Sequence, residues 1–279
     1  MLSILYGLSS ALVWGAADFF GGLASRKARA FQAVLYGEAT GLILLLLSTL
    51  FIHEQPLTLK SWMLCSFAGS LGVLGLLMFF YAFEKGQMTI VAPVSALTAT
   101  ILPVIVGSLT EGFPGYFTFA GFALALVAIY LVSKPAGDTK SLRLRIKDLA
   151  LPLLGGVCFG IYFVIFHEGS QQGLLMPLIA SRSAGTLTMI IFLLVTRQSF
   201  KPAPAGWPYF LLNGILDVSG NGFYLLAGQV GRLDISAVLV SLYPASTVLL
   251  AWLFLHEKIS RSQSVGILAA LVAIALMTI

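Results

Sequence analysis

The chain has 279 residues, of which 58% are hydrophobic and only 10% are charged, and its formal net charge is +5. A soluble domain carries about a quarter charged residues, so this composition argues against a water-exposed surface of such a size. The basic residues lie in a few loops between apolar runs, which argues against a nucleic-acid partner and predicts a protein embedded in the lipid bilayer.

Ten apolar runs are candidate membrane spans, since a helix needs about 20 mostly apolar residues to cross the hydrocarbon core. We predict that each run is α-helical, because a helix satisfies its own backbone hydrogen bonds in lipid. The expected fold class is therefore an all-α polytopic membrane protein with ten transmembrane helices. The predicted spans are 2–23, 31–52, 61–83, 88–109, 115–133, 149–167, 174–196, 207–229, 233–255 and 262–279.

Lysine and arginine are distributed unevenly over the loops. The loops after the even-numbered spans carry only Lys60 and Arg232, whereas the loops after the odd-numbered spans carry most of the others. The positive-inside rule then places the odd-numbered loops in the cytoplasm, and with ten spans both termini are predicted to be non-cytoplasmic. Short loops favour a multi-pass protein of the bacterial inner (plasma) membrane.

Two carboxylates are predicted near each other in the first two spans. Trp14 and Asp18 lie on one face of the first span, and Glu38 follows the first basic loop on the second span, at a similar depth. Neighbouring carboxylates disfavour joint ionisation, which would suit proton coupling. Alternatively, one or both acids reach the basic loop by snorkelling. Five aromatic residues could form a wall for a cation or a ring, or could belong to the core or to lipid contacts. They are Trp14, Tyr36, Phe159, Tyr162 and Phe166.

The fourth and ninth spans contain prolines and correspond to each other. Ser95 and Tyr243 lie on matching faces of these spans and are candidate substrate-binding residues. Pro93, Pro103 and Pro244 are candidate hinges, because proline removes a backbone hydrogen bond and can kink a helix. The alternative is a kink that only aids packing.

The seventh and eighth spans hold the remaining intramembrane charges. Arg182 could bind a carboxylate or phosphate of a substrate, or neutralise Asp217 or Glu38. On the eighth span a polar stripe recurs at helical spacing, and it is predicted either to line a cavity, with Asp217 as a substrate-amine or proton site, or to form structural hydrogen bonds. The stripe comprises Asn213, Asp217, Asn221 and Tyr224.

The sequence repeats itself at a spacing of about 145 residues, so that Trp14-Gly15 corresponds to Phe159-Gly160. Five spans per repeat place the two halves in opposite orientations, and such inverted repeats hold a substrate near the membrane midplane. The predicted organisation is a first repeat at 1–135, a charged linker at 136–148 and a second repeat at 149–279.

Three segments resemble one transporter family. They are GLSSALVWGAADFF (7–20), SLYPASTVLLAWLFLHEKI (241–259) and GILAALVAIAL (266–276), and they are similar to the EamA branch of the drug/metabolite transporter superfamily. The first repeat departs from the pattern, since Thr98-Ala99 stands where Tyr243-Pro244 stands in the second. The resemblance implies a secondary transporter or exporter. It does not imply a substrate, because the family handles amino acids, sugars, nucleotide-derived metabolites and drugs.

The predicted function is secondary active transport, as an exporter or exchanger, of a small metabolite by alternating access. Three intramembrane acids against one arginine favour an amine or amino-acid-like substrate. The alternatives are a lipid or drug transporter of the same fold, and a membrane structural or sensing subunit. The sequence has no signature of an enzyme, a cofactor site or a metal site. The fifth and tenth spans are nearly free of polar residues and could support a homodimer contact.

Overall fold

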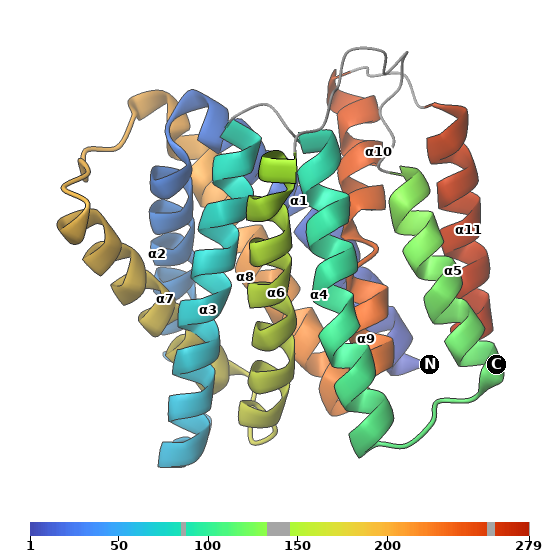
Figure 1. The fold of residues 1–279 in the computed structure, drawn as a ribbon. Coiled ribbons are helices and arrows are strands. Elements are labelled where there is room, and N and C mark those ends of the chain that lie inside the picture. The colour runs from blue at the N-terminus through green and yellow to red at the C-terminus, as the bar shows by residue number, and fades with distance from the viewer. Residues whose placement is uncertain (85–87, 133–145, 256–259, 279) are drawn as a thin grey trace.

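The computed structural model describes residues 1–84, 88–132, 146–255 and 260–278, and in these ranges the chain is helical without a strand (Figure 1). The predicted linker at 136–148 falls largely outside the described residues. The helices of the first half are α1 (Leu2–Lys27), α2 (Ala30–Ser48), α3 (Leu59–Glu84), α4 (Met88–Thr110) and α5 (Tyr116–Val132). Those of the second half are α6 (Ile146–Gly169), α7 (Leu175–Val195), a 3-10 turn (Pro204–Gly206), α8 (Trp207–Gln229), α9 (Leu233–Val240), α10 (Tyr243–Leu255) and α11 (Arg261–Thr278).

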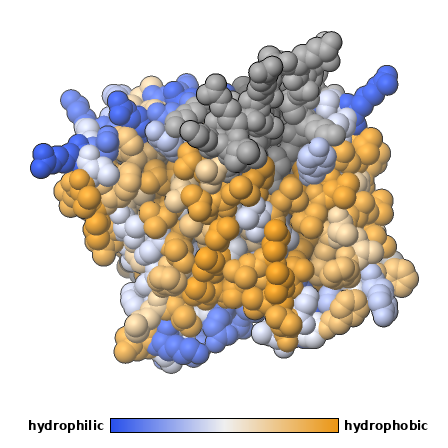
Figure 2. All heavy atoms as spheres, viewed as in Figure 1, coloured by the Kyte–Doolittle hydropathy of each residue, from blue (hydrophilic) through white to orange (hydrophobic). Residues whose placement is uncertain are grey.

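An apolar belt surrounds the bundle. Figure 2 shows a broad hydrophobic band with hydrophilic residues above and below it. Leucine, isoleucine and phenylalanine side chains such as Leu12, Leu47 and Ile105 are more than half exposed on the outer faces of the helices. Exposed apolar surface of this extent is stable against lipid rather than water. The protein is therefore a multi-pass membrane protein.

Five described helices are long and apolar enough to cross a membrane by length and composition, and four shorter apolar helices accompany them. The five are Leu2–Lys27, Ala30–Ser48, Leu59–Ala82, Ala150–Gly169 and Leu175–Val195. The helix α8 belongs to neither group, because Asn213, Asp217 and Asn221 lower its hydropathy. It is an apolar helix that carries a polar stripe, and the stripe needs partners inside the bundle.

The packing of the helices repeats between the two halves. The helix α1 packs against α8 as α6 packs against α3, and α2 packs against α8 as α7 packs against α3. Likewise α4 contacts α6, and α9 and α10 contact α1. Each contact is reproduced when α1–α5 are exchanged for the five spans of the second half. The ends of α1 and α11 that carry the termini lie at the same end of the bundle (Figure 1). These relations confirm the prediction of two inverted five-helix repeats.

Two glycines at corresponding positions of the repeats perform the same task. A Cβ atom added to Gly15 of α1 would collide with the Tyr243 carbonyl and with the Ser246 side chain of α10. A Cβ on Gly160 of α6 would lie 3.1 Å from the Ala99 carbonyl of α4. The absence of a side chain lets each pair of helices approach closely. The repeat in the sequence thus predicts positions with equal packing roles.

The ninth span is a broken helix rather than a continuous one. The helix α9 ends at Val240 and α10 begins at Tyr243, with Ser241 and Leu242 between them. Pro244 has no backbone N–H, so the Val240 carbonyl loses its helical partner. Proline is favoured in the first turn of a helix, where its N–H would be unpaired in any case. The break lies beside the centre of the bundle.

The N-terminus of α7 is fixed by an acidic side chain from the loop between α2 and α3. The carboxylate of Glu54 accepts hydrogen bonds from the backbone N–H groups of Leu174, Leu175 and Met176, at 2.9–3.2 Å. A carboxylate at this position satisfies unpaired donors and interacts favourably with the helix dipole. The contact fixes the helix that carries Arg182.

Candidate functional site

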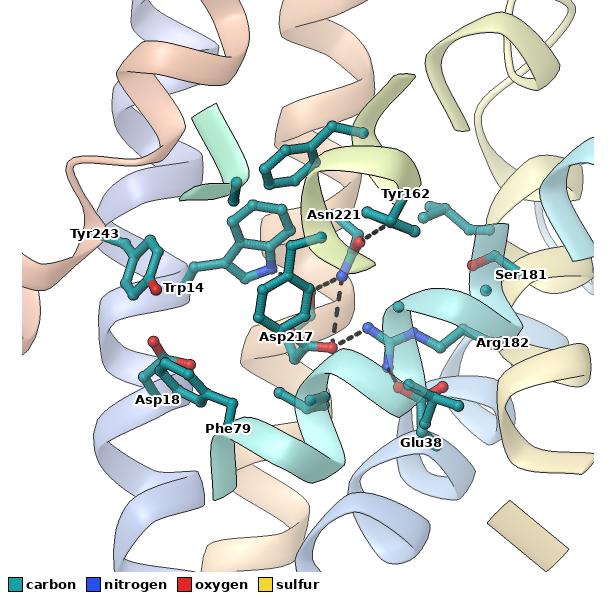
Figure 3. Close-up of a pocket in the computed structure, with 18 of the residues that line it drawn as sticks. Trp14, Asp18, Glu38, Phe79, Tyr162, Ser181, Arg182, Asp217, Asn221 and Tyr243 are labelled. Carbon is teal, nitrogen blue, oxygen red and sulfur yellow. Dashed lines mark hydrogen bonds and ion pairs between the residues drawn. The ribbon is translucent and has the colours of Figure 1, made fainter. Parts of the chain in front are cut away.

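A cavity of about 90 Å³ lies in the interior of the bundle and is lined by helices of both halves. In the same measure of volume one water molecule needs about 10–15 Å³, so the cavity has room for several waters or a small solute. Figure 3 shows its lining residues pointing toward a common centre. The charged and polar ones are Asp18, Glu38, Ser181, Arg182, Asp217, Asn221 and Ser241, and the aromatic ones are Trp14, Phe79, Phe159, Tyr162, Phe163 and Tyr243.

Arg182 of α7 bridges two carboxylates. Its Nη1 donates to Oε1 of Glu38 over 2.5 Å, and its Nη2 donates to Oδ2 of Asp217. The side chains of Arg182 and Glu38 are only 6% and 9% exposed, and that of Asp217 is 18% exposed. A guanidinium stays charged in proteins, so burial is tolerable only with such partners. The three side chains form the acidic–basic–acidic triad of the cavity wall.

Hydrogen bonds extend from the triad to two further helices. The Asn221 side-chain amide donates to the Asp217 carbonyl over 2.7 Å, and its oxygen accepts from the Tyr162 hydroxyl of α6. On the other side, Nε1 of Trp14 donates to the Asp217 carbonyl over 3.2 Å. Asp217 is therefore tied through its backbone to α1 and through its carboxylate to α7.

Asp18 faces the same cavity from α1 but differs from the other acids. Within the described ranges it makes neither an ion pair nor a side-chain hydrogen bond. Figure 3 places it beside Tyr243 and on the opposite side of the cavity from Arg182. With all four groups ionised, the lining carries three negative charges and one positive charge. In that ionisation state the cavity has an excess of negative charge, part of it on an acid that has no counter-ion in the described part of the chain.

The structure brings together most of the residues predicted to form the site. Trp14, Arg182, Asp217, Asn221 and Tyr243 line the cavity, and so do the acids Asp18 and Glu38. The polar stripe of α8 divides into two parts. Its middle, Asp217 and Asn221, faces the cavity, whereas its two ends bind neighbouring helices.

The ends of the stripe act as structural contacts. Asn213 donates from Nδ2 to the Ala17 carbonyl of α1 over 2.9 Å, and the Tyr224 hydroxyl donates to the Phe163 carbonyl of α6 over 2.8 Å. Both side chains are almost fully buried. Helical spacing places all four polar residues on one side of α8, but it does not tell which of them face a cavity and which face another helix.

Two further predicted residues lie outside the cavity. The Tyr36 hydroxyl donates to the Phe200 carbonyl, and the Tyr36 ring packs against Trp207 and Phe210. Ser95 is fully buried and donates to the Pro152 carbonyl over 2.9 Å, which joins α4 to α6. The structure therefore gives both residues packing contacts between helices, and neither reaches the triad.

The three candidate hinges differ in their surroundings. The helix α4 runs without interruption through positions 93 and 103, so Pro93 and Pro103 lie inside a continuous helix. Pro244 follows the break between α9 and α10, next to Tyr243 and Ser241 of the cavity wall. Of the three, only Pro244 accompanies an interruption of its span.

Of the predicted aromatic wall, Trp14, Phe159 and Tyr162 line the cavity, whereas Tyr36 and Phe166 do not. Phe79 and Phe163 also line it and were not predicted. Phe163 of α6 stacks with Trp14, the Tyr162 hydroxyl donates to Asn221, and Phe79 of α3 lines another part of the cavity. Phe159 corresponds to Trp14 in the repeat, and this correspondence indicates the face of α6 that lines the cavity. For Phe79 and Phe163 the sequence offers no such signal, because aromatic residues at helical spacing are equally common on a lipid-facing surface.

The side chains that line the cavity include groups suited to binding a solute. The described residues contain no group of three or more His, Cys, Asp or Glu side chains that could hold a metal ion. The lining offers carboxylates, hydroxyls, an amide and aromatic faces, which suit a cation or a hydrogen-bonding solute.

Comparison with known proteins identifies the family. Residues 1–134 and 147–279 match the EamA-like transporter family, which covers both halves of the chain. No curated protein matches the chain. Among solved structures, one crystal structure superposes with a TM-score of 0.78 and 14% sequence identity, over 99% of this chain and 96% of the other. At this identity the similarity concerns the fold alone.

Proposed function

The chain belongs to the EamA-like transporter family, and we propose that it is a secondary active transporter, an exporter or exchanger, of a small metabolite. The observation that carries this proposal is the cavity between the two inverted halves, with four charged side chains in its wall. Charges inside a membrane protein are costly and accompany solute or ion pathways. A structural subunit would have no need of a cavity beside them.

Alternating access is the mechanism that the geometry supports best. The cavity is lined by both repeats, so a rocking of one repeat against the other would change the side to which it opens. The break before Pro244 lies beside the cavity, since Ser241 and Tyr243 belong to the cavity lining. An interrupted helix can bend at such a point with little loss of hydrogen bonding. We assign the break as the moving element of the second repeat.

Proton coupling uses the triad in this proposal. Protonation of Glu38 or Asp217 would remove one of the two partners of Arg182. The guanidinium remains charged and would move toward the acid that is still ionised. Such a movement would alter the cavity wall that a substrate meets, so proton binding and substrate binding would be coupled, as coupled transport requires.

We place the protein in the bacterial inner membrane, with both termini on the non-cytoplasmic side. The asymmetry of lysine and arginine among the loops supports this orientation. A reporter protein that is active only in the cytoplasm should remain inactive when it is fused to either terminus. Reporter activity would show that the terminus is cytoplasmic and would refute the predicted orientation. The helices α5 and α11 pack against each other and are our candidates for a contact between two copies.

The function can be tested by flux from proteoliposomes. Vesicles containing the purified protein are loaded with a bacterial metabolite extract, a pH gradient is imposed, and the released compounds are identified by mass spectrometry. We expect one or a few compounds to leave vesicles with the wild type and not vesicles with Asp217→Asn. Glu168→Gln is the matched control, because it removes one exposed carboxylate that pairs with Lys60. Equal release from wild-type and protein-free vesicles would reject the transport function.

A further inference from the structure

The positive charge in the cavity wall, on Arg182, is already paired with carboxylates of the protein. Arg182 is the cation among the described residues that line it, and both of its terminal nitrogens bind carboxylates of the protein. A substrate carboxylate or phosphate would have to compete with Glu38 and Asp217 for the same guanidinium. It would also enter a space that already has more negative than positive charge. Like charges repel strongly in a partly desolvated site, so the wall disfavours anionic groups.

Asp18, unlike Arg182, is a charged residue of the cavity wall that has no ion pair among the described residues. It lies on the side of the cavity away from Arg182, beside Tyr243 (Figure 3). In the part of the chain that the structure describes, it has no ion pair of its own. A carboxylate inside a membrane bundle is stabilised by a counter-ion, and the open side of Asp18 is the cavity. A cation that enters the cavity from solution would therefore be the counter-ion of Asp18.

Phe79 and Tyr243 lie beside this carboxylate (Figure 3), and further aromatic rings line the same cavity. Trp14 stacks with Phe163 at a centroid distance of 5.8 Å, and Phe79 lies edge-on to Phe159 and Tyr243 at 6.2 and 6.5 Å. All of these rings line the cavity. Aromatic faces attract cations through the ring quadrupole and pack against flat or apolar bodies. A small hydrophilic ion would make no apolar packing contact with these rings, whereas an organic cation would.

We propose that the transported compound is an organic monocation, an amine attached to an aromatic or other apolar body, with Asp18 as its counter-ion and specificity-determining residue. The inference rests on the proposed transport function and narrows its substrate class. It assigns Asp18 to the substrate and leaves Glu38 and Asp217, with Arg182, to the proton. Free amino acids are disfavoured as substrates, because Arg182, the cation among the described lining residues, is already paired with Glu38 and Asp217.

Four compounds of one scaffold test the charge requirement. They are phenylethylamine, phenylalanine, 3-phenylpropanoate and 2-phenylethanol, which carry a positive charge, both charges, a negative charge and no charge at pH 7. Binding to the purified wild-type protein in detergent is measured by isothermal titration calorimetry. We expect phenylethylamine to bind about tenfold or more tightly than each of the others, since each lacks a favourable charge or adds an unfavourable one. Tighter binding of phenylalanine or 3-phenylpropanoate, or no binding of phenylethylamine, would overturn the inference.

Variants at one position test the role of Asp18. Asp18→Asn should weaken phenylethylamine binding by about tenfold or more, whereas Asp18→Glu should retain most of it. Glu168→Gln, which removes a carboxylate far from the cavity, should bind as the wild type does. Unchanged affinity in Asp18→Asn would refute the assignment, and the compound series decides the substrate class even where that variant fails to fold. Release of zwitterions or anions in the flux experiment would reject the substrate class and leave the transport function standing, whereas absence of any release would reject both.

Discussion

The indole Nε1 of Trp14 donates a hydrogen bond to the backbone carbonyl of Asp217, over 3.2 Å. The bond joins α1 to α8 across the interface between the two repeats, and both residues line the cavity. The carboxylate of Asp217 at the same time binds Arg182. Asp217 is thus held from both halves of the protein. Its backbone carbonyl binds Trp14 of the first half, and its carboxylate pairs with Arg182 of the second half.

Trp14→Phe should separate the hydrogen bond from the aromatic packing. Phenylalanine can still pack against Phe163 and Tyr224, which stack with Trp14 in the wild type. The Asp217 carbonyl loses one donor, so we expect the free energy of unfolding to fall by about 1 kcal/mol. Unfolding in mixed micelles with increasing denaturing detergent measures this change. Trp14→Ala, which also removes the ring, should lose clearly more, and a Trp14→Phe protein as stable as the wild type would argue against a role for the bond.

Arg182→Met should be the most damaging single change in the cavity wall. It leaves Glu38 and Asp217 inside the bundle without their shared cation. Breaking a buried ion pair by removing one partner costs about 3–5 kcal/mol, and we expect a loss of stability of that order, measured in the same detergent titration.

The same prediction has a matched rescue. The triple variant Arg182→Met, Glu38→Gln, Asp217→Asn removes all three charges, so no uncompensated charge remains. Its stability should return close to that of the wild type, because replacing a whole buried ion pair is often neutral. Flux through the triple variant should remain absent. A triple variant that is no more stable than Arg182→Met alone would show that the ion pairs do not explain the loss.

Much of the architecture follows from the sequence, because lipid restricts the choice of structure. A span must be helical, so ten apolar runs and a repeat of about 145 residues suffice to predict two inverted halves. Charged residues within spans must face protein or a cavity. For that reason Asp18, Glu38, Arg182 and Asp217 could be predicted as the centre of the site, and all four line the cavity.

Other features depend on distances between helices, which no periodicity contains. Asn213 and Asp217 are one helical turn apart on α8, yet one binds the Ala17 carbonyl and the other lines the cavity. The sequence also left open whether Arg182 serves a substrate or the protein. Only the approach of α2 and α8 to α7 decides that both of its neighbours are acids. The break at Ser241 was predicted only as a possible kink at Pro244.

Glu54→Gln should destabilise the protein through the N-terminus of α7. The neutral side chain keeps an acceptor oxygen but loses the charge that interacts with the helix dipole and with three N–H groups. We expect a loss of about 1 kcal/mol in the free energy of unfolding. Glu168→Gln removes an exposed carboxylate paired with Lys60 and should cost about 0–1 kcal/mol. If the two variants were equally stable, Glu54 would be no more than a surface charge.

A pair of glycine substitutions tests how closely α3 and α7 must pack. A Cβ on Gly69 would collide with the backbone of Ser181, the residue before Arg182, whereas a Cβ on Gly222 would find only a Leu178 methyl group at 3.9 Å. Backbone atoms cannot rotate away, so Gly69→Ala must push the two helices apart and should cost about 1–3 kcal/mol.

The control variant, Gly222→Ala, should not lose stability. Gly222→Ala adds a side chain in free space within a helix and should be neutral or stabilising by up to about 1 kcal/mol, because alanine favours the helical backbone. Thermal unfolding of both variants in the same detergent measures the difference. Because the Gly69 contact also positions Arg182, Gly69→Ala should reduce flux as well, whereas Gly222→Ala should not. A Gly69→Ala protein with normal stability and flux would mean that α7 can shift without disturbing the triad.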